Sequence, residues 1–532
     1  MQTAPRPERI RKVADPGSGP ERVRYRFGPL ERRGLIAGWR GGQIGSVAAG
    51  LVVGVLALRA YPSVPGVLIA VGAVGAGVAG ACWPVGGRTG DQWLPLAVRW
   101  LVTTVRTGRV QSAPVPGRGQ LVVSGPDGAG AHRSGAASAR SACRWWEGSA
   151  SGVFDSLRIA SCALSDQAGS PAAGVVMDGR SRTATAVLAV RGHSFALLGP
   201  DDQDARLGGW ARVLAALARE GSDVHRVQWV ESCLPDDGTA TRTHQRDRAV
   251  LGVDTAPGRS YASLVDHSAP VTRRHRVLLA VSVHTAHSSR AIRASGGGDR
   301  GTGAVLLREA VALQRLLEDA DATVEGILGP GALATVFRQS SAPMAAVGGT
   351  DGDGTGGDGP STGWPWPMAV ASEWDAVHTD ATWHATYWIA EWPRVDVTPD
   401  FLGPLLFSPL RRSISLVMEP MSPTRAARQV AQARTADIAD GELRRRGGFL
   451  VTARQVREKE GVEHRDAELA DGHAQYRFSG YVTVTADDPD ELRQGCAAVE
   501  QAAGQARMEL RRLYGEQDVA FACTLPLGRG LS

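Results

Sequence analysis

Two long uncharged stretches stand out in the pattern of apolar and polar residues. No charged residue occurs from Gly41 to Leu58, a run of 18 residues, or from Ala60 to Gly87, a run of 28. A helix needs about 20 mostly apolar residues to cross the hydrocarbon layer of a membrane. Because only a short turn around Arg59 separates the runs, the pattern predicts two transmembrane helices joined as a hairpin over residues 41–87. A buried soluble helical hairpin is the alternative.

Small residues recur at four-residue spacing in both runs. Gly50 and Gly54 form such a pair in the first run, and Gly72, Ala76 and Gly80 form a series in the second. Small residues let two helix backbones approach closely within a membrane. We therefore expect these two faces to pack against each other.

Arginines lie on both outer sides of the predicted hairpin, whereas its turn carries only Arg59. The flanking residues are Arg22, Arg24, Arg26, Arg32, Arg33, Arg88, Arg99, Arg106 and Arg109. Basic residues near membrane helices favour the cytoplasmic side, so we expect a multi-pass protein of the cytoplasmic (inner) membrane with both termini in the cytoplasm. A signal peptide is not indicated, because the first apolar run starts late and a second follows at once.

The segment after the hairpin has helical periodicity. From Asp91 to Arg109, apolar residues recur at spacings of three and four, and Trp93 and Trp100 add aromatic rings. We expect an amphipathic juxtamembrane helix over residues 88–112 that lies at the membrane surface. A helix packed on the soluble part of the chain is the alternative.

The rest of the chain alternates strand and helix patterns in three places. The first unit has strands at Val175–Met177, Ala184–Val190 with a continuation at Phe195–Leu198, a helix at Pro200–Arg219 and a strand at Val224–Val230. The second has Val277–Val283, Val305–Leu317, Thr323–Leu328 and Ala332–Arg338. The third has a strand at Tyr476–Ala486, a helix from Asp487 to Tyr514 and a strand at Asp518–Leu525. The β-β-α-β order is typical of ferredoxin-like domains, and its irregular spacing indicates domain duplication rather than a solenoid.

The predicted fold class is therefore α+β, with an N-terminal two-helix transmembrane hairpin followed by cytoplasmic ferredoxin-like repeated domains. The expected segments are a basic cytoplasmic tail (1–40), the hairpin (41–87), the juxtamembrane helix (88–112), three α/β domains (113–255, 256–347 and 366–532) and a linker rich in glycine and aspartate (348–365).

Composition narrows the choice of partner and compartment. The 532 residues carry a net charge of +5, and much of the excess lies in the first 40 residues. A basic tail next to a membrane suits anionic lipid headgroups, whereas a nucleic-acid stripe with interleaved aromatics is not evident downstream. The six cysteines are scattered without a C-x-x-C pair, which fits a reducing cytoplasm.

Catalytic and ligand-binding motifs are not evident in the sequence. The Gly-Lys pair of a P-loop does not occur, and the glycine run at 352–357 lacks a strand-to-helix context. His284 and His287 would need further metal ligands, and His193-Ser194 has no nucleophile-elbow pattern. Asp201, Asp202 and Asp204 open a predicted helix, where capping explains them better than acid–base chemistry. We therefore predict no enzyme activity, no catalytic, cofactor-binding or metal residues, and no cofactor.

Six of the 14 tryptophans fall in one region of the chain, which core packing explains better than an exposed protein interface. They are Trp364, Trp366, Trp374, Trp383, Trp388 and Trp392.

Several stretches resemble known secretion proteins. The hairpin with its basic entry and the segment Trp93–Arg106 resemble the PrgI family, the two-helix inner-membrane component of type IV secretion and conjugation machines. The remainder resembles the N-terminal, non-motor region of their CagE/TrbE-type ATPases, in the stretches 192–198, 210–214, 227–229, 261–265, 391–394, 401–406 and 520–526. The combination is similar to membrane proteins of actinobacterial conjugative elements of the Streptomyces type. The motor domain of the ATPase family has no counterpart up to Ser532, so the resemblance implies a platform that recruits a separate ATPase.

Three hypotheses follow for function. The first is an inner-membrane scaffold of a conjugation or type IV-like secretion apparatus, which would be an oligomer contacting the bilayer, a separate P-loop ATPase and other membrane subunits; contact with DNA is left open. The second is a core component of a type VII secretion machine, because the EccE component has a similar layout. The third is a membrane-tethered enzyme with an unrecognised site, which would require convergent titratable groups in a pocket.

Overall fold

The computed structural model describes residues 41–83, 88–108, 110–112, 121–122, 144–146, 152–163, 172–191, 195–236, 239–248, 252, 254–268, 272–343, 365–447 and 453–531. The predicted tail (1–40), most of the linker (348–365), the glycine run at 352–357, His193-Ser194 and Trp364 lie outside these residues.

Among the described residues, three helices come first, strands β1 to β6 follow with one 3-10 turn among them, and helices and strands are mixed after that. The helices are α1 (Gly41–Ala60), α2 (Val64–Cys82), α3 (Gly90–Thr107), α4 (Pro200–Leu217), α5 (Thr239–Arg248), α6 (Ala256–Ser268), α7 (Ser289–Ala294), α8 (Gly298–Asp319), α9 (Pro330–Ser341), α10 (Gly403–Leu406), α11 (Pro423–Gly447), α12 (Ala453–Ala470), α13 (Pro489–Gln505) and α14 (Gln517–Ala522), with 3-10 turns η1 (Gly152–Phe154) and η2 (Phe195–Leu197). The strands are β1 (Val110–Ser112), β2 (Leu121–Val122), β3 (Arg144–Trp146), β4 (Leu157–Ala163), β5 (Ala172–Asp178), β6 (Thr183–Arg191), β7 (Val224–Pro235), β8 (Arg273–His284), β9 (Thr323–Ile327), β10 (Ala369–Ser372), β11 (Val377–Thr379), β12 (Thr382–Glu391), β13 (Arg412–Pro420), β14 (Tyr476–Ala486) and β15 (Glu509–Arg512).

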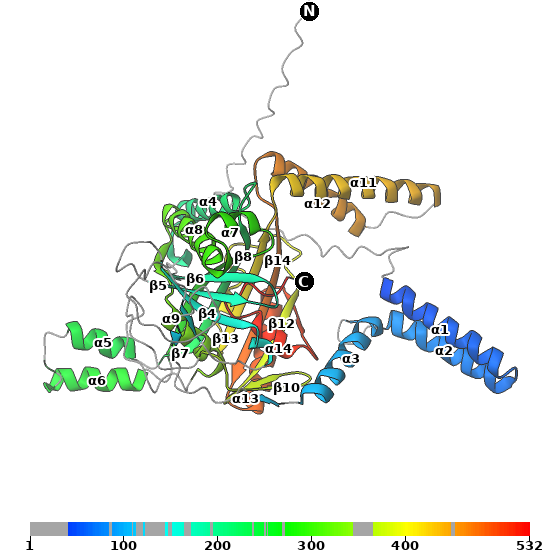
Figure 1. The fold of residues 1–532 in the computed structure, drawn as a ribbon, viewed down its shortest axis with the longest axis horizontal. Coiled ribbons are helices and arrows are strands. Elements are labelled where there is room, and N and C mark those ends of the chain that lie inside the picture. The colour runs from blue at the N-terminus through cyan, green and yellow to red at the C-terminus, as the bar shows by residue number, and fades with distance from the viewer. Residues whose placement is uncertain are drawn as a thin grey trace, which may run out of the picture.

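The two predicted apolar helices are present as α1 and α2, which form a hairpin that extends away from the rest of the chain (Figure 1). Both are long and apolar enough to cross a membrane, and only 11% and 17% of their apolar windows are buried. Leu56 and Leu68 are 59% and 68% exposed. A soluble core helix would bury such side chains, so these exposed faces support the membrane prediction.

The hairpin packs through small residues, but only one of the two predicted faces is correct. A Cβ atom on Gly50 would lie 2.8 Å from the carbonyl oxygen of Ala73 and 3.3 Å from the Cα atom of Gly77, and Gly54 approaches Ala70 similarly. The predicted face of Gly72, Ala76 and Gly80 is wrong: nothing lies within 4 Å of a Cβ placed on Gly72 or Gly80. The contact face of α2 is instead the one that carries Ala70, Ala73 and Gly77.

One antiparallel sheet forms the centre of the body, by which we mean the described residues from 110 to 531. Its strand order is β1-β10-β11-β12-β14-β13-β7-β8-β6-β5-β4-β3-β2, and β15 and β9 pair with β12 and β6. The middle of the sheet is the pairing of β7 with β13, where Val230 lies opposite Ser415.

The mixed α and β content matches the predicted class. Ferredoxin-like repeats are not confirmed, because strands from the predicted first and third domains share this sheet.

The two halves of the sheet repeat one order of elements. A β hairpin (β5–β6 or β11–β12) leads to a long strand (β7 or β13), a helical pair (α5–α6 or α11–α12) and a second long strand (β8 or β14). A helix (α8 or α13) then leads to a strand that returns to the hairpin. The residue that follows this last strand is also held in the same way in both halves. Leu328, after β9, donates its N–H to the carbonyl oxygen of Val187, and Leu513, after β15, donates its N–H to the carbonyl oxygen of Thr386. Because β7 and β13 are antiparallel, the two helical pairs leave from opposite ends of the sheet (Figure 1).

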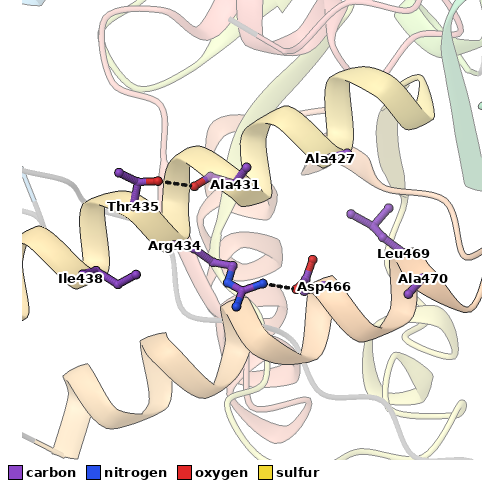
Figure 2. Close-up of a pocket in the computed structure, with 8 residues that line it drawn as sticks. All are labelled: Ala427, Ala431, Arg434, Thr435, Ile438, Asp466, Leu469 and Ala470. Atoms are coloured by element: carbon purple, nitrogen blue, oxygen red, sulfur yellow. Dashed lines mark hydrogen bonds and ion pairs between the residues drawn. The ribbon is translucent and has the colours of Figure 1, made fainter.

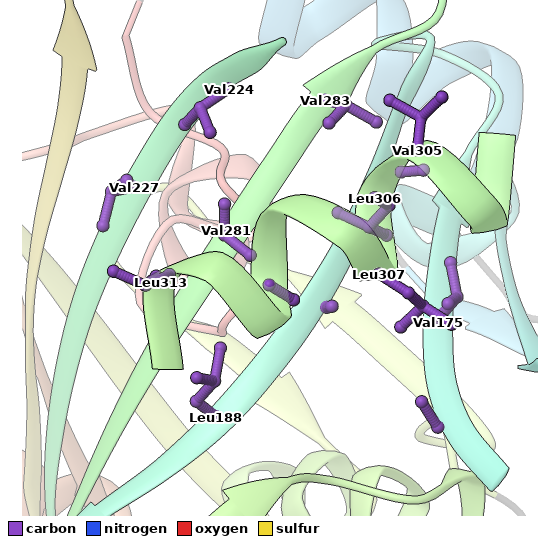
Figure 3. Packing of buried hydrophobic residues seen from close by; sticks show 14 of the residues in the cluster. Val175, Leu188, Val224, Val227, Val281, Val283, Val305, Leu306, Leu307 and Leu313 are labelled. Atoms are coloured by element: carbon purple, nitrogen blue, oxygen red, sulfur yellow. The ribbon is translucent and has the colours of Figure 1, made fainter. Parts of the chain in front are cut away.

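Helices cover the first half of the sheet through a large apolar core. Helix α8 places Val305, Leu306 and Leu313 against side chains of β5, β6, β7 and β8, including Val281 and Leu188 (Figure 3). All five of these side chains are fully buried. Burial of a side chain of this size stabilises the fold by about 1.5–3 kcal/mol, so this layer holds the half together.

The segment that follows α14 ties the two halves together. Gln228 of β7 is fully buried and donates to the carbonyl oxygens of Cys523 and Leu525, each at 2.9 Å, and its side-chain oxygen accepts from the N–H of Gly528 at 2.7 Å. Arg529 then donates to Asp178 of β5 at 2.8 Å. A buried amide needs such partners because an unpaired one costs about 1–3 kcal/mol.

Three predicted elements are wrong in kind or length. Residues 195–197 form the 3-10 turn η2 and not a strand. The predicted helix to Tyr514 ends at Gln505 as α13, since Arg507 has φ +56° and the chain turns back into β15. The predicted final strand is helix α14. A short apolar run does not distinguish a strand from a buried helix.

We predict that Gly50→Val disrupts the hairpin and that Gly72→Val does not. The added side chain meets the α2 backbone at position 50 and open space at position 72. Overpacking of about 1–3 kcal/mol would speed amide hydrogen exchange in α1 and α2 roughly tenfold or more. The measurement is hydrogen exchange of both variants in detergent micelles; greater sensitivity at position 72 would contradict the observed packing face.

Candidate membrane-proximal interface

Helix α3 joins the hairpin to the body. Its first residue, Gly90, lies against the end of α2, since a Cβ there would be 2.8 Å from the carbonyl oxygen of Gly80. After α3 the chain enters β1, which pairs with β10 at the edge of the sheet with Val110 opposite Ala371. The short chain between these contacts makes α3 the link between the hairpin and the sheet.

Aromatic rings hold one face of α3 on the body. The Trp93 ring stacks on Trp374 with ring centroids 5.9 Å apart and lies 5.8 Å from the ring of Tyr514. Trp100 meets Trp374 edge-on at 5.3 Å. The Trp374 ring in turn packs on Gly515, which has φ +73° and where a Cβ would lie 2.8 Å from the ring. Glycine is suited to this position because it adopts positive φ readily and leaves room for the ring.

Charges reinforce the same contact. A carboxylate oxygen of Glu516 lies 3.7 Å from a guanidinium nitrogen of Arg88, and the other lies 3.5 Å from one of Arg99. Arg88 precedes α3 and Arg99 lies within it, so one carboxylate contacts both. Burial lowers the pKa of the Arg88 guanidinium, and the charge of Glu516 opposes that change. Within the described part of the chain, Arg88 Nη1 and Trp100 Nε1 are buried without an acceptor. Ring packing and charge therefore dominate this contact.

We call these six residues the junction cluster: Arg88, Trp93, Trp100, Trp374, Tyr514 and Glu516. The sequence predicted Trp93 and Trp100 on an amphipathic helix, and α3 confirms the helix. It did not predict their partners, which lie several hundred residues later. The face of α3 away from the cluster is apolar and open: Leu94, Leu101 and Val105 are 67%, 57% and 76% exposed.

The predicted tryptophan region divides between core and junction. Trp366 is buried against Phe154 and Phe337, with ring centroids 5.8 and 4.8 Å away. Trp383 and Trp392 pack at the margin of the core under α13. Trp374 belongs to the junction cluster.

The structure adds a third imidazole to His284 and His287. His225, at the start of β7, has its ring centroid 5.2 Å from that of His284 and 5.8 Å from that of His287, and those two are 4.6 Å apart. Burial, together with Arg226, lowers the pKa of His225 to about 4. Among the described residues no set of His, Cys, Asp or Glu is arranged to hold a metal ion. The third ring comes from a distant strand, which spacing along the sequence could not reveal.

Other titratable groups singled out by the sequence or the structure have structural roles. Asp201 and Asp202 lie in the first turn of α4, where the helix dipole favours them. A network missed by the sequence analysis joins the two halves: buried Arg412 of β13 donates to buried Glu231 of β7 at 2.5 Å, and the half-exposed His275 of β8 lies 2.7 Å from the same carboxylate. Each group has an opposite charge or a hydrogen-bonding partner, which suits a role in holding the β7–β13 pairing.

A groove of about 550 Å³ lies between α11 and α12. It is lined by Ala427, Ala431, Arg434, Thr435, Ile438, Asp466, Leu469 and Ala470, and Arg434 donates to Asp466 across it at 2.6 Å (Figure 2). Three of the lining residues are alanines, whose small side chains fill little of the space between the two helices. Ile438 is 72% exposed.

No protein-family model and no curated protein matches the sequence.

We predict that Trp374→Ala loosens α3 without unfolding the sheet. The substitution removes two ring contacts, each worth about 1 kcal/mol, and would speed amide exchange in α3 about 30-fold. Trp392→Ala is the matched control, because the Trp392 ring packs on Phe401 and Phe478, which are not part of the junction cluster. The measurement is site-resolved hydrogen exchange; equal exchange in α3 for the two variants would contradict the role assigned to the junction cluster.

Proposed function

We propose that this protein is an inner-membrane scaffold subunit of a conjugation or type IV-like secretion apparatus, which anchors or docks a separate P-loop ATPase. It works by contact and does not itself catalyse a reaction. The observation that carries the proposal is the exposed apolar hairpin held to the sheet through the junction cluster. Such a link would keep the body at a defined place on a membrane.

The proposed placement is multi-pass, with both termini and the body in the cytoplasm. Support comes from the arginines on the outer sides of the hairpin, of which Arg88 and Arg99 lie beside Glu516 of the body. Basic residues close to membrane helices favour the cytoplasmic side. The junction cluster would then sit just below the cytoplasmic surface of the bilayer.

The shape of the body supports a docking role. The helical pairs α5–α6 and α11–α12 project from opposite ends of the sheet (Figure 1). Several exposed apolar side chains lie on them, including Leu264 at 63% and Ile438 at 72%. In this proposal the partners are the bilayer, the ATPase and other membrane subunits, including further copies of this chain, and contact with DNA remains open to test.

Two alternatives keep the membrane anchor. An EccE-like core component of a type VII secretion machine would use the same hairpin and body and would co-purify with a multi-ATPase translocase. A membrane-tethered enzyme would have to convert a substrate at a catalytic site in the body. The resemblance of the stretches at 192–198 and 401–406 to the non-motor region of secretion ATPases favours the first proposal.

The test is recovery of the tagged full-length chain from cell membranes. We predict that it stays in the membrane fraction after an alkaline wash and is released only by detergent. Leu56→Arg combined with Leu68→Arg should shift it to the wash, because each arginine within a membrane helix costs about 3 kcal/mol. Leu197→Arg is the control, since Leu197 is 86% exposed outside the hairpin.

The same preparation tests the partner. A P-loop ATPase encoded as a separate chain should co-purify, and the purified protein alone should not hydrolyse ATP. Recovery of a multi-ATPase translocase with small helical substrates would favour the type VII alternative. A chain that stayed in solution without detergent, or that turned over ATP unaided, would overturn the proposal.

A further inference from the structure

We propose that α3 lies flat in the surface of the bilayer, with its exposed apolar face at the boundary between headgroups and acyl chains. This inference rests on the proposed membrane anchorage of α1 and α2. It makes the lipid surface a second binding partner of the chain, separate from the hydrocarbon core that the hairpin would occupy.

The side chains of α3 divide into three faces around the helix. One face, with Trp93 and Trp100, packs on the body. The second, with Leu94, Val98, Leu101 and Val105, is apolar and at least half exposed. These four positions recur at spacings of three and four, which places them on one stripe.

The third face of α3 is polar. Arg99 lies 3.5 Å from Glu516 of the body but still has 58% of its side chain exposed, and Thr103 donates to the carbonyl oxygen of Arg99 within the helix. A helix with an apolar stripe, flanking aromatic rings and basic residues on a polar face is typical of interfacial membrane helices.

The position of α3 identifies lipid as the occupant of the apolar stripe. Its first turn abuts the end of α2 at Gly80, so the stripe begins close to the hairpin, whose own apolar side chains are exposed. Figure 1 shows α3 running across the hairpin axis and not along it. A bilayer spanned by the hairpin would therefore have its surface roughly parallel to α3 and next to it.

This arrangement gives the body a fixed orientation. The hairpin alone would fix the position of the body in the membrane but leave its tilt free. With one face packed on Trp374 and Tyr514 and another on the lipid, α3 would hold the edge of the sheet at β1 and β10 toward the bilayer. The projecting helical pairs would then keep constant directions relative to the membrane.

The test is the depth of single spin labels on the full-length protein in phospholipid nanodiscs. Labels go to cysteines placed at Leu101, Val105 and Thr103, with Cys82 and Cys143 replaced by serine; the other four cysteines are buried and stay. A label at Leu68, 68% exposed on α2, reports on the hairpin. The readout is accessibility to oxygen, which concentrates in lipid, against accessibility to a water-soluble nickel chelate.

The expected result is an oxygen-to-nickel ratio several-fold higher at positions 101 and 105 than at position 103, and highest at position 68. A label at Val98 provides a third site on the stripe if one labelled variant fails to fold. If position 68 is in lipid while positions 98, 101 and 105 are as open to nickel as position 103, the inference is overturned and membrane anchorage stands. If position 68 is also open to nickel, both are overturned.

Discussion

The packing of α3 on Trp374 and Tyr514 is the contact through which the hairpin and the sheet are positioned relative to each other. Its strength comes from ring contacts at 5.3–5.9 Å and from one carboxylate, Glu516, shared by two arginines. The Arg99 side chain is 58% exposed, and exposed ion pairs contribute little, so the rings supply most of the stabilisation and the charges add to it. In the proposed membrane-bound state, this contact would fix the orientation of the sheet relative to the hairpin, whereas a flexible linker would leave it free.

A fixed orientation of the body requires that its two halves form one rigid unit, and two sets of contacts join them. The halves of the sheet join through the β7–β13 pairing, which carries the buried ion pair between Glu231 and Arg412. The segment after α14 adds a second connection through Gln228. The repeated order of elements explains why α5–α6 and α11–α12 emerge at opposite ends. In our proposal, an orientation set at α3 would therefore also fix the directions of both helical pairs.

Charge-free length and helical periodicity were enough to predict the hairpin and α3, because these depend on local pattern alone. The packing face of α2 was not predictable, since small residues occur on several of its faces and spacing cannot choose between Gly72 and Ala73. The junction cluster and the third imidazole, His225, depend on strand pairing between distant segments. Helix α14 was misread because its apolar run is short enough to suit either a strand or a buried helix.

The most direct test of whether the junction cluster fixes the orientation of the body is an image of the protein in a lipid bilayer. Single-particle cryo-electron microscopy of the full-length chain in nanodiscs should give one dominant orientation of the body, with the β1–β10 edge next to the bilayer and density for α3 at the headgroup level. If the body instead adopted a broad range of tilts about a well-defined hairpin, the junction cluster would not hold it and the account would fail.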